Sequence, residues 1–421
     1  MIQWLTEQGC GAMKKTKSRK NLKASSPRAV GIGLVGAGFM GRIHANAWRQ
    51  APLFFDLACR PTLAVVASGH ARESSDFAAK WGVAKAASSW DRLIKDPTIA
   101  LVDVCVPNNL HAEVSMAALK AGKHVACEKP LGTTITEARD MALAALEAKN
   151  GARTFVWFNY RRCPAVSLMR ELIQQGRLGR IRHIRAHYLQ DWGRASTPHS
   201  WRFDSKLAGS GAHGDLNAHS IDMARFVTGD EIVQVCGAME AQFIHERAAV
   251  TASSKNLGLG SQKSKRGAKR QASTVDDAFL FLARMRNGAV ASFEASRMAT
   301  GNKNANCMEI NGELGSVKFN FERMNELQWW DDTLPAREQG WSTILCTEPT
   351  HPYVGHFWPP GHVLGYEHQF ISMAADICAV LAGGEPAQPL ADFVDAYRTQ
   401  QVLEAAIISA RERCWMQTDA L

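Results

Sequence analysis

The first 160 residues alternate short, continuously apolar runs with amphipathic segments. The apolar runs predict buried strands, and they lie at Ala29–Val35, Leu63–Ser68, Leu101–Val106, His124–Cys127 and Thr154–Phe158. The segments between them have helical periodicity, and the predicted helices lie near Arg42–Gln50, Arg72–Gly82, His111–Ala121 and Thr136–Lys149. Apolar strands that alternate with helices are typical of a parallel sheet covered on both faces. We therefore predict an α/β domain with a doubly wound parallel sheet over residues 29–160.

The pattern changes after residue 160, where apolar and polar positions alternate along most segments. Such alternation predicts strands with one buried face, and they lie at Ile181–Leu189, Ile232–Phe243, Ala278–Met285, Ala289–Ser296, Asn306–Asn311 and Ser316–Phe321. The pair Asn287-Gly288 predicts a tight hairpin turn. Helices are predicted at Pro164–Gly176 and over residues 391–413. Residues 161–421 are thus predicted to form an α+β domain with an open, mostly antiparallel sheet.

Two basic segments account for the positive charge of the chain. Of its net charge of +9, residues 1–28 contribute +6 and residues 248–275 another +6, so that the rest carries −3. Neither segment interleaves aromatic residues with its charges, as many nucleic-acid binders do. We interpret them as a flexible tail and a flexible insertion, and we expect no nucleic-acid partner.

Signals for targeting and for metal binding are weak. No apolar run approaches the roughly 18 residues of a membrane span, and the basic start of the chain lacks the apolar segment of a secretory signal. The ten cysteines are scattered singly, without a Cys-x-x-Cys pair. Scattered thiols are typical of a reducing compartment. We therefore expect a cytoplasmic protein without a membrane partner or a metal site.

A glycine-rich turn follows the first predicted strand. The stretch Val30–Gly41 satisfies G-x-G-x-x-G in two registers, which begin at Gly31 and at Gly36. A dinucleotide-binding turn follows a strand and precedes a helix, and only the second register does so. A tight turn without a ligand is the alternative. The residues of the second register are Gly36, Gly38, Phe39, Met40 and Gly41.

Two further segments carry residues suited to proton transfer. Lys129 follows the fourth predicted strand, and ligands of doubly wound sheets bind beyond the carboxyl ends of the strands. Asp215 and His219 are four residues apart in a predicted helix, so they would share a face. The carboxylate could then orient the imidazole as a general base. The alternatives are a solvated lysine, a helix cap at Asp215 and an ordinary interior histidine.

Other polar and aromatic residues could line the same pocket. The candidates are Pro107, Asn108, His111, Tyr160, Arg161 and Trp192. Asn108 could instead cap the following helix, and the other residues could be plain surface. The segment His351–His368 holds four histidines and four aromatic residues. We interpret it as a rigid loop on the substrate side rather than as a metal site.

These motifs, in this order, resemble those of the Gfo/Idh/MocA family, the glucose–fructose oxidoreductase and inositol 2-dehydrogenase-like NAD(P)-dependent enzymes. They are G-x-G-x-x-G, P-N-x-x-H at residues 107–111, E-K-P at 128–130 and D-x-x-x-H at 215–219. The most specific stretch is A-G-K-H-V-A-C-E-K-P-L-G. The resemblance extends over Val30–Met416. It implies a Rossmann domain followed by an α/β domain whose open sheet often forms homodimer or homotetramer contacts.

The resemblance also implies roles for single residues. Lys129, Asp215 and His219 correspond to the catalytic residues of the family, with His219 as the proton acceptor. The residues expected to bind the cofactor are Gly36, Gly38, Phe39, Met40, Gly41, Ser68, His70, Pro107, Asn108, His111 and Glu128. Those expected to bind substrate are Lys129, Tyr160, Arg161, Trp192, Asp215 and His219. The implied reaction transfers hydride between a secondary hydroxyl of a sugar, sugar derivative or cyclitol and the nicotinamide.

The sequence leaves the choice between NAD and NADP open. An acid at the end of the second strand normally binds the ribose of NAD, but this strand ends in Ser68-Gly69-His70, and Asp56 precedes it. His70 and Arg72 could accept a 2′-phosphate instead. Two other roles of the same fold are alternatives: a glycosidase that uses bound NAD, and a dinucleotide-sensing regulator without catalytic residues.

Overall fold

The computed structural model describes residues 28–249 and 269–421. The tail predicted at residues 1–28 lies outside these ranges except for Arg28, and so does most of the insertion predicted at 248–275. The described ends of the insertion form strands β9 (Glu246–Ala248) and β10 (Arg270–Ala272), which pair antiparallel. Backbone pairing and an ion pair from Arg270 Nε to Glu246 Oε2, 3.1 Å long, hold these residues. The flexibility of the insertion stays a prediction.

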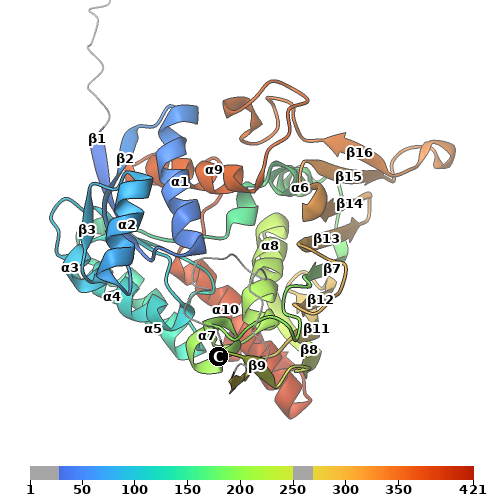
Figure 1. Cartoon of the computed structure of the whole chain (residues 1–421). Coiled ribbons are helices and arrows are strands. Elements are labelled where there is room, and N and C mark those ends of the chain that lie inside the picture. The colour runs from blue at the N-terminus through green and yellow to red at the C-terminus, as the bar shows by residue number, and fades with distance from the viewer. Residues whose placement is uncertain (1–27, 250–268) are drawn as a thin grey trace, which may run out of the picture.

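The N-terminal half is a parallel six-stranded sheet with helices on both faces (Figure 1). Its strands are β1 (Arg28–Val35), β2 (Cys59–Ala67), β3 (Lys85–Ala87), β4 (Leu101–Val104), β5 (His124–Cys127) and β6 (Thr154–Val156), in the order β3-β2-β1-β4-β5-β6. Its helices are α1 (Phe39–Phe54), α2 (Ala71–Trp81), α3 (Trp90–Ile94), α4 (His111–Lys120) and α5 (Ile135–Leu146). The strand order reverses between β1 and β4, which opens a crevice beyond their carboxyl ends. The doubly wound Rossmann sheet predicted from the sequence is confirmed.

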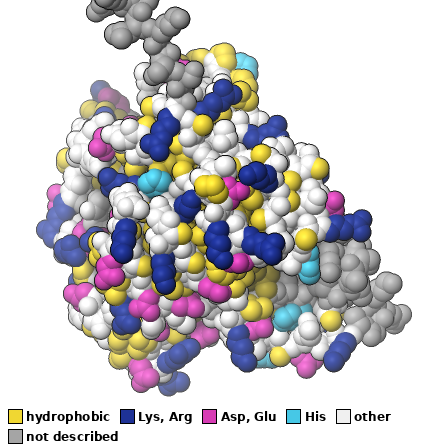
Figure 2. All heavy atoms as spheres, turned by 90° about the vertical axis from the view of Figure 1, so that its left-hand side faces the viewer, with side chains coloured by type: hydrophobic (Ala, Val, Ile, Leu, Met, Phe, Trp, Pro, Cys, Tyr) yellow, Lys and Arg dark blue, Asp and Glu magenta, His cyan; other side chains and the backbone are white. Residues whose placement is uncertain are grey.

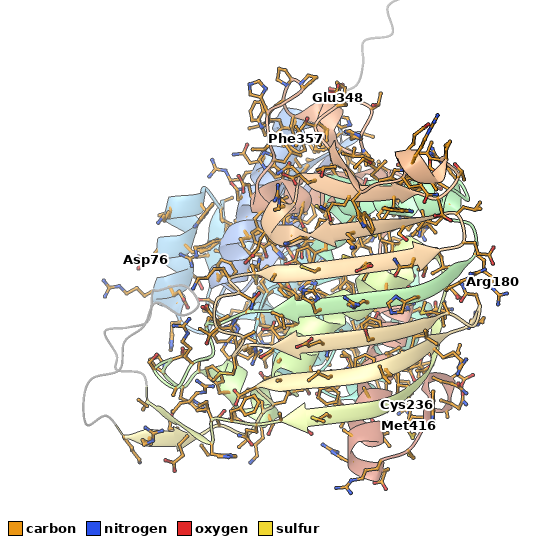
Figure 3. All side chains as sticks on the ribbon, turned by 90° about the vertical axis from the view of Figure 1, so that its right-hand side faces the viewer. Asp76, Arg180, Cys236, Glu348, Phe357 and Met416 are labelled. Atoms are coloured by element: carbon orange, nitrogen blue, oxygen red, sulfur yellow. The ribbon has the colours of Figure 1, made fainter. Side chains whose placement is uncertain are left out.

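The second half is built on an open nine-stranded sheet (Figure 3). Its strands are β7 (Ile181–Leu189), β8 (Ile232–Ala241), β11 (Ala278–Met285), β12 (Val290–Ser296), β13 (Ala305–Gly312), β14 (Gly315–Asn320), β15 (Glu326–Asp331), β16 (Ser342–Leu345) and β17 (Met416–Gln417). The order is β16-β15-β14-β13-β7-β12-β11-β8-β17, and every neighbouring pair except β7 with β12 is antiparallel. The predicted open, mostly antiparallel sheet is therefore confirmed.

Helices cover one face of the nine-stranded sheet. Those that pack on its strands are α6 (Pro164–Gln174), α8 (Ala218–Thr228) and α10 (Phe393–Glu412), and the other helices of this half are α7 (Ser205–Ala208) and α9 (Tyr366–Leu381). Strand β11 shows the two faces clearly, because Phe279 and Phe281 are buried whereas Leu280 and Leu282 are exposed. In Figure 3 the open face, with Arg180 and Cys236 near its edges, is turned to the viewer.

The last two long helices return to the N-terminal domain. Helix α9 packs against α1, and α10 packs against both α5 and β8. The backbone N–H of Val156 in β6 donates to the carbonyl of Ala391 at 2.8 Å. The division at residues 160 and 161 stays a prediction, because α10 contacts β6 of the first sheet and β8 of the second, and α9 contacts β2 of the first. The sequence prediction omitted α9, whose residues 369–378 are all buried, so a one-sided apolar stripe is absent from it.

The histidine-rich segment before α9 lies elsewhere than expected. Phe357 packs on the end of α1, with ring centroids 5.0 Å from Phe54 and 5.5 Å from Phe55. Within His351–His368, only Tyr366 lines the cavity described below. The interpretation as a substrate-side loop is therefore wrong for most of the segment, because Phe357 and Trp358 pack on the end of α1 instead.

The surface of the described chain carries mixed charges. Over the face on the Rossmann side, Figure 2 shows Lys and Arg side chains interspersed with Asp and Glu. Within residues 28–249 and 269–421, no helix is both long enough and apolar enough to cross a membrane.

Candidate active site

The glycine turn has the close approaches that a dinucleotide-binding turn requires. Gly31 and Gly33 lie inside β1, so the motif is the register of Gly36, Gly38 and Gly41. Gly36 has φ +114°, and a Cβ there would lie 2.4 Å from the carbonyl oxygen of Cys105. A Cβ at Gly41 would meet the Gly36 carbonyl at 2.1 Å, whereas one at Gly38 would meet nothing within 4 Å. The turn is thus tight against the protein and open toward the crevice, which fits a pyrophosphate at the start of α1.

A cavity of about 1380 Å³ extends from this turn to the second domain. The N-terminal domain contributes the glycine turn, the end of β2, the segment after β4 and the E-K-P segment. The second domain contributes residues of β7, the segment before α8 and the segments that flank β12 and β13. A cleft between two domains is where ligand sites commonly lie.

Lys129 and Asp215 meet at the inner end of the cavity. Lys129 Nζ donates to Asp215 Oδ1 and to the Asp215 carbonyl, both at 2.8 Å. Arg297 Nη2 donates to the other carboxylate oxygen at 2.9 Å. Burial would raise the pKa of Asp215, but the charges of Lys129, Arg297 and Arg202 hold it well below its usual range. Asp215 is therefore an anion that fixes two cations in the cavity wall.

His219 lines the cavity one helical turn beyond Asp215. It is 8 % exposed, and its Nδ1 has no hydrogen-bond partner among the described residues. The ring of Tyr160 packs edge-on against it, with centroids 4.8 Å apart. Burial lowers the pKa of His219 well below its usual value, and the nearby charge of Lys129 lowers it further. His219 is therefore neutral at physiological pH and can accept a proton.

The structure corrects the expected contact between Asp215 and His219. In the described structure, the hydrogen bonds of the Asp215 carboxylate go to Lys129 and Arg297. Residues His213–Asn217 form a π-helical turn, and His219 lies in the α-helix that follows it. Two cations are also stronger partners for a carboxylate than a neutral imidazole. Asp215 acts on Lys129 here, rather than on His219.

Most of the predicted cofactor residues lie along the cavity. Those that line it are Gly36, Gly38, Phe39, Met40, Ser68, Pro107, Asn108, His111 and Glu128. Asn108 does not cap the next helix through its side chain, which donates to the Ala208 carbonyl at 2.9 Å. His111 links two neighbouring segments, because its ring nitrogens lie 2.8 and 3.1 Å from the carbonyl oxygens of Pro130 and Val106. Gly41 lies behind the lining and allows α1 to approach Gly36.

Two predicted residues lie away from the cavity. Arg161 is 4 % exposed, and its guanidinium pairs with Asp222 and Asp395. This ion-pair network ties the start of the second domain to α8 and α10, so the expectation of substrate contact is corrected. His70 is also absent from the described lining of the cavity. Arg72 points into solvent, with 94 % of its side chain exposed.

The substrate end contains a hydrogen-bonded wall that the sequence prediction largely missed. Of the predicted residues, Tyr160 and Trp192 belong to it. The Tyr160 and Tyr188 hydroxyls lie 2.7 Å apart, and Asn304 Oδ1 accepts from Tyr188 and from Gln190 at 2.7 and 2.6 Å. Trp192 Nε1 donates to Gln190 at 2.5 Å. Tyr188, Gln190 and Trp192 alternate along the end of β7 and the residues after it, whereas Tyr160 and Asn304 come from other parts of the chain.

Two arginines of the wall were missed as well. Arg297 directly follows β12, and Arg202 stacks on Trp201 with its Cζ 4.4 Å from the ring centroid. Burial lowers the pKa of Arg202, and the charge of Asp215 opposes this. The position of Arg297 at the end of a strand was the one available signal.

Comparison with known proteins matches both domains of the chain. A family model described as "Oxidoreductase family, NAD-binding Rossmann fold" matches residues 30–158, and the "GFO/IDH/MocA C-terminal domain" matches residues 166–318. Levoglucosan dehydrogenase of Pseudarthrobacter phenanthrenivorans is 39 % identical over 388 residues, which cover 91 % of this chain and 97 % of the relative.

Solved structures agree with this match over nearly the whole chain. An oxidoreductase domain protein from Kribbella flavida has a TM-score of 0.86 at 44 % identity, covering 93 % of this chain and 99 % of that one. A levoglucosan dehydrogenase in complex with NADH and levoglucosan has a TM-score of 0.84 at 37 % identity, with the same coverage. With the glycine turn and both domain matches in place, the chain belongs to the Gfo/Idh/MocA family and is an NAD(P)-dependent oxidoreductase.

Proposed function

We propose that the protein oxidises a secondary hydroxyl of a pyranose-type sugar such as levoglucosan, with His219 as the general base and Lys129 as the donor to the reacting oxygen. One observation carries this proposal: the imidazole of His219 lines the cavity that begins at the glycine turn, together with the Lys129–Asp215 pair. Bound nicotinamide supplies the hydride acceptor.

Each step falls to a residue with the required charge state. His219 takes the hydroxyl proton, because its low pKa leaves the imidazole neutral. Lys129 donates a hydrogen bond to the same oxygen and stabilises the negative charge that develops there. Asp215 holds the ammonium of Lys129 in position through two contacts of 2.8 Å. The same three groups serve the reverse reaction, in which His219 returns the proton.

The wall around this centre supports a hydroxyl-rich substrate. Tyr160, Tyr188, Gln190, Asn304 and Trp192 present a chain of donors and acceptors to the cavity. These groups pair with one another, and the hydroxyl and amide groups among them have further donor and acceptor capacity that the hydroxyl groups of a ligand can use. The relatives that act on levoglucosan and on myo-inositol also favour a sugar or cyclitol.

We propose NAD rather than NADP as the preferred cofactor. Glu73, in the first turn of α2, lines the cavity next to Ser68 and Gly69 at the end of β2. Its carboxylate would repel a 2′-phosphate in this corner. The basic residues considered for a phosphate, His70 and Arg72, do not line the described cavity.

The test is a screen of levoglucosan, common aldoses, inositols and glycosides with either cofactor, in which the absorbance of reduced nicotinamide is followed. We expect turnover of levoglucosan or a related pyranose with NAD. Release of free sugar without net NADH would instead indicate a glycosidase. Tight NAD binding without turnover of any substrate would indicate a regulator.

We further propose that the protein is a cytoplasmic homodimer or homotetramer assembled through the open face of the nine-stranded sheet. Met239, Leu280, Leu282 and Val290 are 38 to 64 % exposed on adjacent strands β8, β11 and β12. An apolar patch of this kind is typical of an interface. The free cysteines of the described chain suit a reducing compartment. Sedimentation of the wild type and of Leu282→Lys tests the assembly, because a charged residue there should dissociate it.

A further inference from the structure

A buried histidine joins the glycine turn to the catalytic end of the cavity. His44 lies on α1, three residues after Gly41, and is 0 % exposed. Its Nδ1 lies 3.1 Å from each carboxylate oxygen of Asp103 on β4, and its Nε2 lies 3.0 Å from Oε1 of Glu128. Asp103 is fully buried and Glu128 is 4 % exposed. Helix α1, strand β4 and the residue after β5 therefore meet in one chain of hydrogen bonds, from Asp103 through His44 to Glu128.

This geometry favours a proton on each nitrogen of His44. A neutral ring has one N–H, so its second nitrogen would present a lone pair to a carboxylate. Burial alone would lower the pKa of His44, but the charges and hydrogen bonds of Asp103 and Glu128 raise it to about 9. Cys105 also faces the ring, with Sγ 3.0 Å from Nδ1. Burial raises the pKa of Cys105 well above its usual value, so it stays a neutral thiol.

The Asp103 end of the chain is anchored in a dry site. Its carboxylate accepts the indole N–H groups of Trp48 at 2.6 Å and Trp157 at 2.9 Å. The rings of Trp157 and Phe370 cover the imidazole, with centroids 4.0 and 5.7 Å away. These rings carry no charge, so Asp103, Glu128 and Cys105 are the titratable neighbours of His44 in the described structure. Asp103 therefore holds one side of the imidazolium in a fixed place.

The Glu128 end reaches the candidate catalytic lysine. Oε1 of Glu128 faces His44, and Oε2 accepts the backbone N–H of Lys129 at 3.1 Å. Because both oxygens are engaged, the carboxylate has little freedom to rotate. Lys129 in turn donates through Nζ to Asp215. A change in Glu128 would therefore displace Lys129 relative to the reacting groups.

We propose that His44 is a positioning residue for the reaction: its imidazolium fixes Glu128, and Glu128 fixes the backbone that carries Lys129. The role rests on the proposed dehydrogenase function and assigns His44 no contact with substrate. Without the imidazolium, two carboxylates would share a dry site, and one would take up a proton. A protonated Glu128 loses part of its acceptor capacity toward the Lys129 N–H, and the lysine is then less well placed.

A metal ion is the competing explanation for this cluster. His44, Asp103 and Cys105 offer donor atoms that lie within 4.8 Å of one another. Metal ligation needs a free imidazole lone pair and a deprotonated thiol. The two carboxylates around His44 and the raised pKa of Cys105 favour the protonated forms of both groups instead.

A double-mutant cycle tests the proposed role. We expect His44→Gln to lower kcat at least about 10-fold, with the substrate KM changed less than about 3-fold, because the lysine acts on the transition state. In a protein that already carries Glu128→Gln, His44→Gln should lower kcat less than about 2-fold further, since His44 acts through Glu128. Wild-type kcat in His44→Gln, or equal losses in both backgrounds, would overturn the proposal.

The control is His124→Gln on β5, which replaces a histidine whose Nδ1 accepts a backbone N–H from Arg153 at 2.9 Å and contacts no carboxylate. It should keep the wild-type kcat. If His44→Gln does not fold, His44→Gln/Asp103→Asn keeps the net charge of the cluster and should show the same loss of kcat.

A measurement on the unmodified protein is independent of catalysis. With ¹⁵N-labelled histidine, NMR should show both nitrogens of His44 protonated at pH 8, without added metal or cofactor. A neutral ring, or a shift on adding Zn²⁺, would contradict the imidazolium even in an active enzyme. An inactive enzyme with an intact imidazolium would instead count against the proposed dehydrogenase function.

Discussion

Two buried histidines, His44 beneath the cavity and His219 at its inner end, have opposite charge states. His44 faces a carboxylate at each nitrogen, and its pKa is raised to about 9. His219 has an unpartnered Nδ1 and a nearby lysine, and its pKa is lowered well below the usual value. Burial lowers the pKa of both rings, so the difference comes from their partners.

The comparison shows how one fold assigns two roles to one residue type. A histidine that is protonated at neutral pH cannot serve as a base there, but it can hold two carboxylates in place. A histidine that is neutral at that pH holds an anion poorly, but it can accept a proton from a substrate. Lys129 lies between the two sites, because its backbone contacts Glu128 and its ammonium contacts Asp215.

The largest expected effect is on stability, and it concerns His44. Because folding raises the pKa from 6.5 to about 9, the contribution of His44 is complete below pH 6.5 and is lost as the pH rises through 9. The linked change is on the order of 3 kcal/mol. The free energy of unfolding of the wild type, measured with urea, should therefore fall as the pH rises over this range. The fall should be smaller in His44→Gln and unchanged in His124→Gln. An equal fall in all three proteins would contradict the assigned charge state of His44.

The next effect concerns the lysine between the two sites. We expect Lys129→Ala to lower kcat at least about 100-fold while NAD still binds. The substitution also removes a positive charge that lowers the pKa of His219. The acidic limb of the residual kcat/KM profile should therefore move to higher pH. Steady-state kinetics across pH, with NAD affinity from protein fluorescence, check both points, and near-normal turnover would contradict them.

The smallest effect concerns the far end of the cavity. Glu73→Gln removes a carboxylate near the end of β2, and we expect it to raise kcat/KM for NADP about 3- to 10-fold, as suits one exposed charge. The value for NAD should change little. The ratio of the two values measures this effect separately from the histidine sites. An unchanged ratio of kcat/KM for NAD to that for NADP would show that Glu73 does not determine the cofactor preference.

Local patterns in the sequence were enough to predict the two sheets and the glycine turn between β1 and α1. Continuous apolar strands, the glycine turn and alternating strands each depend on near neighbours in the chain, and the strands at His124–Cys127 and Ile181–Leu189 have their predicted bounds. The segment 369–378 is buried on all sides, so its helix left no amphipathic stripe to detect. The elements that could be predicted were therefore those that are buried on one face, or continuously buried strands between clear turns.

The candidate site was predictable where it follows a strand and not where it depends on tertiary partners. Lys129 and Glu128 follow β5, and their position alone suggested them. The partners of Asp215 could not be read from its spacing to His219, because they are Lys129 and Arg297 from distant parts of the chain. Arg161 was predicted to line the pocket, but in the structure it forms ion pairs with Asp222 and Asp395. Long-range pairing of charges decides these roles.

The most direct test of the central claim is the rate of hydride transfer in His219→Asn, measured in single turnover with NAD and the substrate found in the screen. Loss of the neutral base should lower this rate at least about 100-fold, while NAD affinity and the stability of the fold stay near those of the wild type. A rate within about 3-fold of the wild type, in a folded variant that binds NAD, would contradict the assignment of His219 as the base.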